Sequence, residues 1–297
     1  MKRNFLQKVL GRLSALGMFD FLSDKNYLSL VFWARMTKKI DWKNPKTFNE
    51  KLQWLKLYDR FDKYIDLVDK YAVKGIVGEI IGNEFIIPTI GVFDKFEDIN
   101  FDLLPDKFVM KCTHDSGGVV VVKDKCKFNK IDSKKFLEKS LRRNYYNYSR
   151  EWPYKNVKPR ILIEKFIDFN DSQEIPDYKF MCFNGTVKCS FVCTERYSSD
   201  GLKVTFFDRN WDVMPFERHY PKSYVKIPKP ENYEMMVELA EKLSKGIPFV
   251  RVDFYNVNGQ IYFGELTFYP GSGFEEFSPE EWDYILGDWI NLHDVQR

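Results

Sequence analysis

Two short segments near the C-terminal end place acidic, basic and hydroxyl side chains on either side of a predicted hairpin turn. Arg251 and Asp253 precede the turn at 256–259, and Glu265 and Thr267 follow it. The Asn-Gly pair in that turn is a strong hairpin signal. Because side chains alternate between the two faces of a strand, Arg251 shares a face with Asp253, and Glu265 shares a face with Thr267. We expect Asp253 and Glu265 to lie side by side across the ladder.

Two facing carboxylates repel each other unless a cation lies between them. Mg²⁺ prefers oxygen ligands, so the pair predicts a magnesium site, with Arg251 completing a surface that could face a phosphate. Under this interpretation, neutralising either carboxylate leaves the metal-free protein at least as stable as before. The alternative is a structural ion network in which Arg251 pairs with the acids, and the same changes then weaken the fold.

A second candidate phosphate site is a glycine-containing turn between two apolar strands. Lys111 ends the strand KFVMK, and Ser116, Gly117 and Gly118 follow it, just before the run VVVV. Glycines let backbone N–H groups approach phosphate oxygens, and a neighbouring ammonium group neutralises the phosphate charge. The alternative interpretation is a hairpin turn that binds no ligand.

Two further segments carry charge along predicted strands. RILIEKFI runs into Glu164, Lys165, Phe166 and Ile167 before a polar loop, and Lys179 alternates with apolar neighbours. The first pattern is typical of a buried strand that reaches the surface, and the second of a solvated strand lysine. Taken alone, neither segment indicates a ligand.

The composition argues against several functional classes. The 46 Lys and Arg residues against 43 Asp and Glu leave a net charge of +3, which is too small for a general nucleic-acid binder. Five cysteines without a CxxC pair and three scattered histidines argue against a disulfide framework and a zinc site. No apolar run reaches the roughly 20 residues that span a bilayer, so we expect a cytoplasmic protein. The sequence contains no motif of a serine hydrolase, a P-loop enzyme or a dinucleotide-binding fold.

The first 22 residues of the chain predict an amphipathic basic helix, with apolar residues at helical spacing and Lys or Arg between them. Such a helix could dock on an anionic membrane face, or it could fold onto its own domain. We favour the second interpretation.

The rest of the chain is predicted to be mainly helical up to about residue 100 and mixed after it. Thr47 followed by Glu50 forms a capping box, so a helix should begin near Phe48. Further helices are expected over 68–81 and 232–245, with a strand around 85–94 that Pro88 interrupts. A hairpin is expected over 107–122.

Several segments, taken in order, resemble the ATP-grasp superfamily: LPDKFVMKCTHDSGG, ILIEKFID, PDYKFMCFNG and RVDFYNVNGQIYFGELTFYPGSG. Together with NPKTFNEKLQWLKL and VDKYAVKGIVGEIIG, they resemble its TupA-like branch, which is associated with teichuronopeptide and capsular polysaccharide synthesis. The resemblance covers roughly residues 40 to 275. It implies an α+β fold in which two α+β subdomains clasp ATP. The mainly helical region would be 1–100, the first subdomain 101–165 and the second 166–297.

The resemblance also implies roles for the candidate residues that bind ATP. Lys111 would contact a phosphate, and the turn at 116–118 would be the flexible loop that closes over the phosphates. The backbone of the segment 164–167 would be the hinge that contacts adenine, and Lys179 would be a second phosphate contact.

The same resemblance implies that the C-terminal hairpin carries the chemistry. Asp253 and Glu265 would bind Mg²⁺, and Thr267 stands where many members of the superfamily have asparagine, which puts the third metal ligand in doubt. Arg251 would steady an acyl-phosphate, so that Arg251 and Lys179 are the expected catalytic residues.

The function that this resemblance implies is an ATP-dependent and Mg²⁺-dependent carboxylate–amine ligase that works through an acyl-phosphate. The carboxylate would be a uronic acid of a capsular or cell-surface polysaccharide or its precursor, and the amine an amino acid or amino alcohol. Two alternatives stay open. One is a glycosyltransferase of the same synthesis, and the other is a peripheral scaffold that contacts the inner face of the membrane through its N-terminal helix.

Overall fold

The computed structural model describes residues 3–169, 177–195, 198, 201–292 and 295. The chain divides into two compact units. Unit 1 comprises Met1–Arg60, Asn147–Trp152 and Glu174–Arg297, and unit 2 comprises Phe61–Tyr146 and Pro153–Gln173. The three-part division at residues 100 and 165 stays a prediction.

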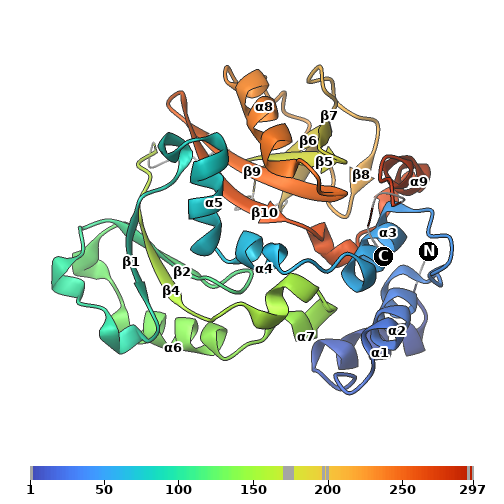
Figure 1. Cartoon of the computed structure of the whole chain (residues 1–297), viewed down its shortest axis with the longest axis horizontal. Coiled ribbons are helices and arrows are strands. Elements are labelled where there is room, and N and C mark those ends of the chain that lie inside the picture. The colour runs from blue at the N-terminus through green and yellow to red at the C-terminus, as the bar shows by residue number, and fades with distance from the viewer. Residues whose placement is uncertain (1–2, 170–176, 196–197, 199–200, 293–294, 296–297) are drawn as a thin grey trace. The chain divides into compact units, whose positions relative to one another are not determined.

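Unit 2 is built around a four-stranded antiparallel sheet (Figure 1). Its strands, in the order β1-β4-β2-β3, are β1 (Thr89–Phe93), β2 (Phe108–Cys112), β3 (Val119–Val122) and β4 (Ile161–Lys165). Its helices are α4 (Lys63–Val68), α5 (Ala72–Ile81) and α6 (Lys130–Leu141), and α7 (Tyr145–Ser149) spans a boundary between the units. The predicted hairpin over 107–122 is confirmed, because β2 and β3 pair from Phe108↔Val122 to Lys111↔Val119.

Two elements of unit 2 begin later than predicted. The helix expected over 68–81 begins at Ala72, because the Asp69 side chain accepts hydrogen bonds from the N–H groups of Tyr71 and Ala72 at 2.8 and 3.2 Å. The strand expected around 85–94 begins at Thr89. Pro88 lies just before it, and a proline has no N–H for the ladder.

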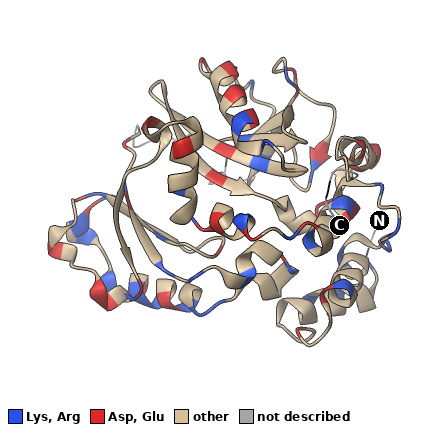
Figure 2. Cartoon of the chain, viewed as in Figure 1, with Lys and Arg blue, Asp and Glu red and all other residues tan. Residues whose placement is uncertain are grey.

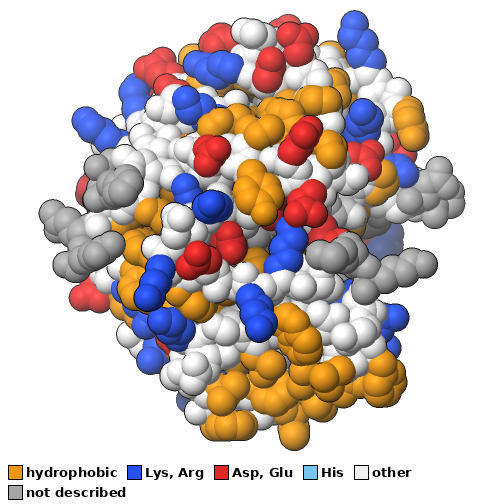
Figure 3. Space-filling model, turned by 90° about the vertical axis from the view of Figure 1, so that its right-hand side faces the viewer, with side chains coloured by type: hydrophobic (Ala, Val, Ile, Leu, Met, Phe, Trp, Pro, Cys, Tyr) orange, Lys and Arg blue, Asp and Glu red, His pale blue; other side chains and the backbone are white. Residues whose placement is uncertain are grey.

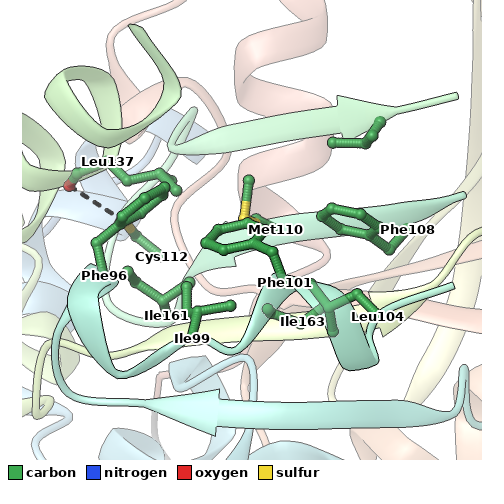
Figure 4. Close-up of a cluster of buried hydrophobic side chains, with 11 residues drawn as sticks. Phe96, Ile99, Phe101, Leu104, Phe108, Met110, Cys112, Leu137, Ile161 and Ile163 are labelled. Atoms are coloured by element: carbon green, nitrogen blue, oxygen red, sulfur yellow. Dashed lines mark hydrogen bonds between the residues drawn. The ribbon is translucent and has the colours of Figure 1, made fainter. Parts of the chain in front are cut away.

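The core of unit 2 lies between its sheet and the segments that cover one face of it (Figure 4). Alternation along β2 buries Phe108, Met110 and Cys112, and α6 adds Leu137. The Cys112 thiol donates to the backbone carbonyl of Leu137 at 3.7 Å. This packing fixes the face of β2 that points inward, so Lys111 must point to the other face.

Unit 1 contains a five-stranded antiparallel sheet in the order β10-β9-β5-β6-β7. Its strands are β5 (Asp177–Phe183), β6 (Thr186–Thr194), β7 (Lys203–Phe207), β9 (Phe249–Val257) and β10 (Gln260–Thr267). Helix α8 (Tyr233–Ser244) packs on β5, β6 and β9, which confirms the helix predicted over 232–245. A small second sheet pairs β8 (Glu217–Arg218) with β11 (Phe277–Ser278).

The other helices of unit 1 are α1 (Phe5–Ala15), α2 (Asp24–Met36), α3 (Phe48–Tyr58) and α9 (Glu281–Asp288). The capping box of α3 is confirmed: the Thr47 side chain accepts from the Glu50 N–H at 3.2 Å, and Glu50 accepts from the Thr47 N–H at 3.0 Å. Helix α3 packs against α9. None of the helices in the described part of the chain has the length and apolar character needed to span a bilayer.

Helix α1 folds onto its own unit, and its two buried residues are polar. It packs against α2 through Gln7 and Ser14, which are buried, and Gln7 Nε2 donates to the Trp33 carbonyl at 3.0 Å. The apolar residues Phe5, Leu6 and Leu16 stay exposed. The prediction of a helix is therefore confirmed, and its apolar residues are divided between half-buried positions, namely Val9, Leu10 and Leu13, and exposed ones.

A fully buried lysine joins three segments of unit 1. Lys56 Nζ of α3 donates to Gln53 Oε1 at 3.0 Å, to the Ser149 carbonyl at 3.0 Å and to the Ser272 carbonyl at 2.8 Å. Glu151, also buried, accepts from the hydroxyls of Ser149 at 2.9 Å and Ser272 at 2.7 Å. Burial lowers the pKa of Lys56 to about 7, against the attraction of Glu151, and burial raises the pKa of Glu151.

The bonds of Lys56 hold the segment Pro270–Gly273, a short 3-10 turn that follows β10, against α3. Gly271 and Ser272 have φ values of 58° and 54° there, which is the left-handed region that a serine adopts at a cost. Hydrogen bonds from Lys56 and Gln53 to the Ser272 carbonyl, at 2.8 and 3.0 Å, help to offset that cost.

Replacing Lys56 by methionine should destabilise unit 1. The change keeps most of the side-chain volume, but it removes the donor to three oxygens and the countercharge of Glu151, which should cost about 3 kcal/mol. Thermal and urea denaturation would measure the loss. The exposed Lys43→Met is the matched control and should stay within about 0.5 kcal/mol of wild type. Equal stability of the two variants would show that the Lys56 network contributes nothing.

Candidate functional site

One row of the larger sheet carries three charged residues on adjacent strands. Lys179 of β5 is the register partner of Asp253 of β9, and Asp253 is the partner of Glu265 of β10. The expected juxtaposition of Asp253 and Glu265 is therefore present. Figure 2 shows acidic and basic segments together on the strands of this sheet.

A β-bulge at Gly264 produces this register. Pairing from the turn is regular as far as Phe263↔Phe254, and the next pair is Glu265↔Asp253, so Gly264 is the extra residue. Without a bulge, Glu265 would pair with Val252 and point to the opposite face. The absence of a side chain matters here, because a Cβ on Gly264 would lie 3.1 Å from the Asp253 carbonyl oxygen.

Arg251 lies between the two carboxylates on the same face of the sheet. Its Nε and Nη2 donate to Asp253 Oδ1 and Oδ2, both at 2.6 Å, and Nη2 also donates to Glu265 Oε1 at 2.9 Å. Thr267 Oγ1 donates to the same Glu265 oxygen at 3.2 Å. The cation between the acids in this structure is thus the guanidinium group, as the ion-network interpretation expects.

Lys179 completes the cluster from the other side of Asp253. Its Nζ lies 2.5 Å from Asp253 Oδ2 and 2.6 Å from Asp177 Oδ2. The side chains of Lys179 and Asp253 are 11% and 3% exposed, whereas that of Glu265 is 45% exposed. The cluster therefore extends from a buried ion pair to a carboxylate that solvent or a ligand can reach.

Burial and the neighbouring charges set the ionisation of this cluster. Burial alone would raise the pKa of Asp253, but Arg251 and Lys179 outweigh it and hold that pKa below its usual range. Burial likewise opposes the charges of Lys179 and Arg251, and the attraction of Asp253 raises the pKa of both. Asp177 differs, because burial raises its pKa.

The donor set of the hairpin fits Mg²⁺ in its chemistry. Mg²⁺ is usually held by one or two carboxylates, with waters and substrate phosphates completing its shell. Asp253 and Glu265 supply two carboxylates, and Thr267 supplies a hydroxyl group next to Glu265. Within the described ranges, no group of three or more His, Cys, Asp or Glu side chains is placed to hold a metal ion. A site here would therefore depend on a bound phosphate for further ligands.

Unit 2 has a charged cluster of its own, centred on Glu164 of β4. Lys111 Nζ of β2 lies 2.6 Å from Glu164 Oε2, and Lys74 of α5 contacts Glu164 Oε1. Lys74 Nζ also donates to the Ile87 carbonyl at 2.6 Å. One buried carboxylate thus orients two lysines whose side chains are 12% and 18% exposed.

The charge of Glu164 depends on these lysines. Burial would raise the pKa of this carboxyl, but Lys111 and Lys74 hold it below the usual range. Burial lowers the pKa of Lys74, and the attraction of Glu164 opposes that shift. A phosphate that approached Lys74 and Lys111 would place further negative charge beside the two ammonium groups, in addition to the charge of Glu164.

The glycine turn of unit 2 has one anchored side and one open side. Gly117 and Ser116 are exposed, and Gly117 has a φ of 97°, which favours glycine. Asp115 is buried and accepts a hydrogen bond from the Ser140 hydroxyl. Gly118 is buried, and its carbonyl accepts from the Cys112 N–H at 2.8 Å. Phosphate binding by this turn stays a prediction.

The predicted adenine segment lies partly in a strand. Glu164 and Lys165 belong to β4, and Phe166 and Ile167 follow it, half buried. The Lys165 N–H donates to the Pro88 carbonyl at 3.0 Å, so that group already has a partner. The Glu164 side chain has a clear structural task, which its sequence position alone did not indicate.

Two residues that sequence reasoning did not select belong to these clusters. Lys74 lies on the same helical face as the buried Val77 and Gly78, and a lysine on a buried face was the available signal. Asp177 shares a strand face with Lys179, two residues away, so alternation could have identified it.

An α+β chain with an antiparallel sheet in each of two units, and with a basic and acidic cluster on each sheet, is of the ATP-grasp class. The family model described as TupA-like ATPgrasp matches residues 50–291, and the chain belongs to this family. A search of curated proteins found no match.

Solved structures to which this chain is similar include two D-alanine–D-alanine ligases. The Bacillus anthracis enzyme, complexed with ATP, is 20% identical over 65% of this chain and 53% of its own, with a TM-score of 0.38. The Helicobacter pylori enzyme is 18% identical over 76% and 63%, with a TM-score of 0.41. The ATP-grasp ligase PsnB, with a minimal precursor, Mg and ADP, is 12% identical over 74% and 57%, with a TM-score of 0.38. The chain thus matches little more than half the length of the first of these proteins. The fold of the chain is identified by the family match.

The contacts of the two hairpin carboxylates predict different losses of stability when each is neutralised. Asp253→Asn should cost about 3 kcal/mol without metal, because Arg251 and Lys179 lose a buried countercharge. The half-exposed Glu265→Gln should cost less than about 1 kcal/mol. Repulsion between the acids predicted no loss for either variant, and the contacts of Arg251 reverse that expectation for Asp253. Urea denaturation of both variants would decide, and equal costs would contradict the role given to Arg251.

Glu164 should make the stability of unit 2 depend on pH in the acid range. Because the folded pKa is lowered, its stabilisation is present above the unfolded pKa of about 4.3 and is lost as pH falls through the folded value. Glu164→Gln should therefore lower the melting temperature near neutral pH, and its curve should approach that of wild type at low pH. The exposed Glu79→Gln on α5 is the control. Parallel curves for wild type and Glu164→Gln would contradict the pairing with Lys74 and Lys111.

Proposed function

We propose that this protein is an ATP-dependent carboxylate–amine ligase, and the observation that supports this most is the charged row on β5, β9 and β10. Membership of the TupA-like ATPgrasp family makes ATP the expected nucleotide. Lys179 in the row and Arg251, two residues before Asp253, provide cations, and Asp253 and Glu265 provide oxygen ligands on the same sheet face. Phosphoryl transfer between anions needs this combination.

The proposed reaction has two balanced steps. A carboxylate oxygen of the substrate attacks the γ-phosphorus of ATP, the bond to ADP breaks, and an acyl-phosphate forms. An amine nitrogen then attacks the acyl carbon, phosphate leaves, and the nitrogen loses a proton. The products are an amide, ADP and phosphate.

The residues of unit 1 have distinct tasks in this proposal. Arg251 presents a guanidinium group that can steady the acyl-phosphate oxygens, and Lys179 neutralises phosphate charge. Mg²⁺, held by Asp253 and Glu265 beside Thr267, would supply further stabilisation of the phosphate charge. Asp253 orients both cations through its contacts with Arg251 and Lys179. In unit 2, Lys111 and Lys74 present ammonium groups suited to phosphate.

The proposed carboxylate is a uronic acid of a capsular or cell-surface polysaccharide, or its precursor, and the amine is an amino acid or amino alcohol. The association of the TupA-like branch with teichuronopeptide and capsular polysaccharide synthesis supports this choice. We also propose that the protein is located in the cytoplasm, where ATP is available to it.

A substrate screen tests the proposed reaction. Wild-type protein with ATP and Mg²⁺ should release ADP only when a competent uronic acid and amine are both present, and the product mass should equal their sum less one water. Glu265→Gln should reduce that release by at least about a hundredfold, through loss of a ligand for Mg²⁺.

The other outcomes separate the alternatives. Consumption of a nucleotide sugar without ATP cleavage would identify a glycosyltransferase. Absence of turnover across the screen, with no ATP binding by calorimetry, would support a scaffold and contradict the ligase. Full activity of Glu265→Gln would contradict the assignment of the hairpin.

A further inference from the structure

Helix α1 and the turn after it expose an apolar surface in unit 1, which we call the N-terminal apolar surface and define as Phe5, Leu6, Leu16, Met18 and Phe21. Phe5, Leu16 and Phe21 are 83%, 76% and 82% exposed. Figure 3 shows hydrophobic side chains gathered in the lower part of the face it presents. A concentration of large exposed apolar side chains is characteristic of an interaction surface.

The orientation of α1 is specified by its own contacts. Gln7 and Ser14 lie two turns apart on one helical face, and both are buried. The capping box between Asn4 and Gln7 begins the helix, and Gln7 Nε2 bonds to the Trp33 carbonyl of α2. Phe5 and Leu16 share the opposite face. The unit therefore holds the helix by the face of Gln7 and Ser14 and leaves the side chains of Phe5 and Leu16 exposed.

Basic side chains flank this surface and enter a cavity. Arg12 follows Phe5 by two helical turns and Lys8 lies beside them, and both line a cavity of about 1030 Å³ together with Arg3, Arg35, His219 and Glu276. Arg35 of α2 is held there by the rings of Tyr148 and Phe274, 5.4 and 5.1 Å from its guanidinium carbon. Four cationic side chains against one carboxylate favour an anionic partner.

The geometry points to an anionic phospholipid membrane as the partner of this surface. A helix of 11 residues is about 16 Å long, too short to span a bilayer. A short helix with an apolar face and flanking Lys and Arg is suited to lie in the interface plane of a bilayer. The apolar side chains would enter the acyl boundary, and the cavity would receive a headgroup phosphate, which four cationic groups complement.

This surface lies outside the charged row of the larger sheet, so the inference does not depend on the proposed ligase activity. It changes the interpretation of the N-terminal helix: the helix folds onto its own domain and also presents a membrane-docking face. The two interpretations of its sequence pattern are therefore compatible.

Vesicle binding by the full chain tests the inference. Wild type should co-sediment with vesicles that contain phosphatidylglycerol, should bind phosphatidylcholine vesicles much more weakly, and should be released by high salt. Phe5→Ser/Leu16→Ser/Phe21→Ser should weaken binding at least about tenfold, because apolar burial in the bilayer is lost. Lys8→Gln/Arg12→Gln should weaken binding and reduce the effect of salt.

Controls keep the result specific. Leu103→Ser/Ile131→Ser removes two exposed apolar side chains from unit 2, 81% and 69% exposed, and should bind vesicles as wild type does. Circular dichroism and melting curves should confirm that all variants fold. Equal binding to both vesicle types, or unchanged binding of the triple variant, would overturn the inference. Absence of vesicle binding together with a dimer that the triple variant abolishes would overturn it and assign the surface to self-association.

Discussion

Two buried carboxylates of this protein, Asp253 and Glu164, are in direct contact with cations that hold their pKa values below the usual range, and much of the local architecture follows from these contacts. Asp253 meets Arg251 and Lys179, and Glu164 meets Lys74 and Lys111. An isolated charge in a protein interior is costly, so each carboxylate requires its cations on neighbouring strands or helices. The strand register that brings them together is therefore part of the stability of each unit as well as of its candidate chemistry.

The same contacts determine how the two charged clusters would accommodate a bound phosphate. Each cation pairs with a carboxylate in the structure, so a phosphate would join an existing network and share its donors. Lysine and arginine can do this because each carries several N–H donors. The half-exposed Glu265 offers the one carboxylate of the Arg251 network that is readily reached from solvent.

Local patterns in the sequence predicted a large part of this structure. Period-two alternation and the Asn-Gly turn predicted the β9–β10 hairpin, and the capping box predicted the start of α3. The family resemblance added the ATP-grasp fold, which the family match confirms. The hairpin and the start of α3 depend on residues close together in the chain, so local sequence patterns are sufficient to predict them.

Three features could not be predicted, and each depends on distant contacts. The bulge at Gly264 is one extra residue, and nothing in the local pattern distinguishes it from a regular strand glycine. Lys56 lies one helical turn after the buried Leu52, but the carbonyls of 149 and 272 that it bonds come from distant segments. The face of α1 that packs is set by the Trp33 carbonyl of α2, which helical periodicity cannot reveal.

The six residues Asn147–Trp152 return to unit 1 between two stretches of unit 2. They carry buried groups that unit 1 uses: Glu151 accepts from the Ser272 hydroxyl, and the Arg150 guanidinium group donates to the Asp20 carbonyl at 3.0 Å. Neither unit is therefore a continuous stretch of chain. In evolutionary terms, recombination at a single crossover cannot exchange one unit and leave the other whole.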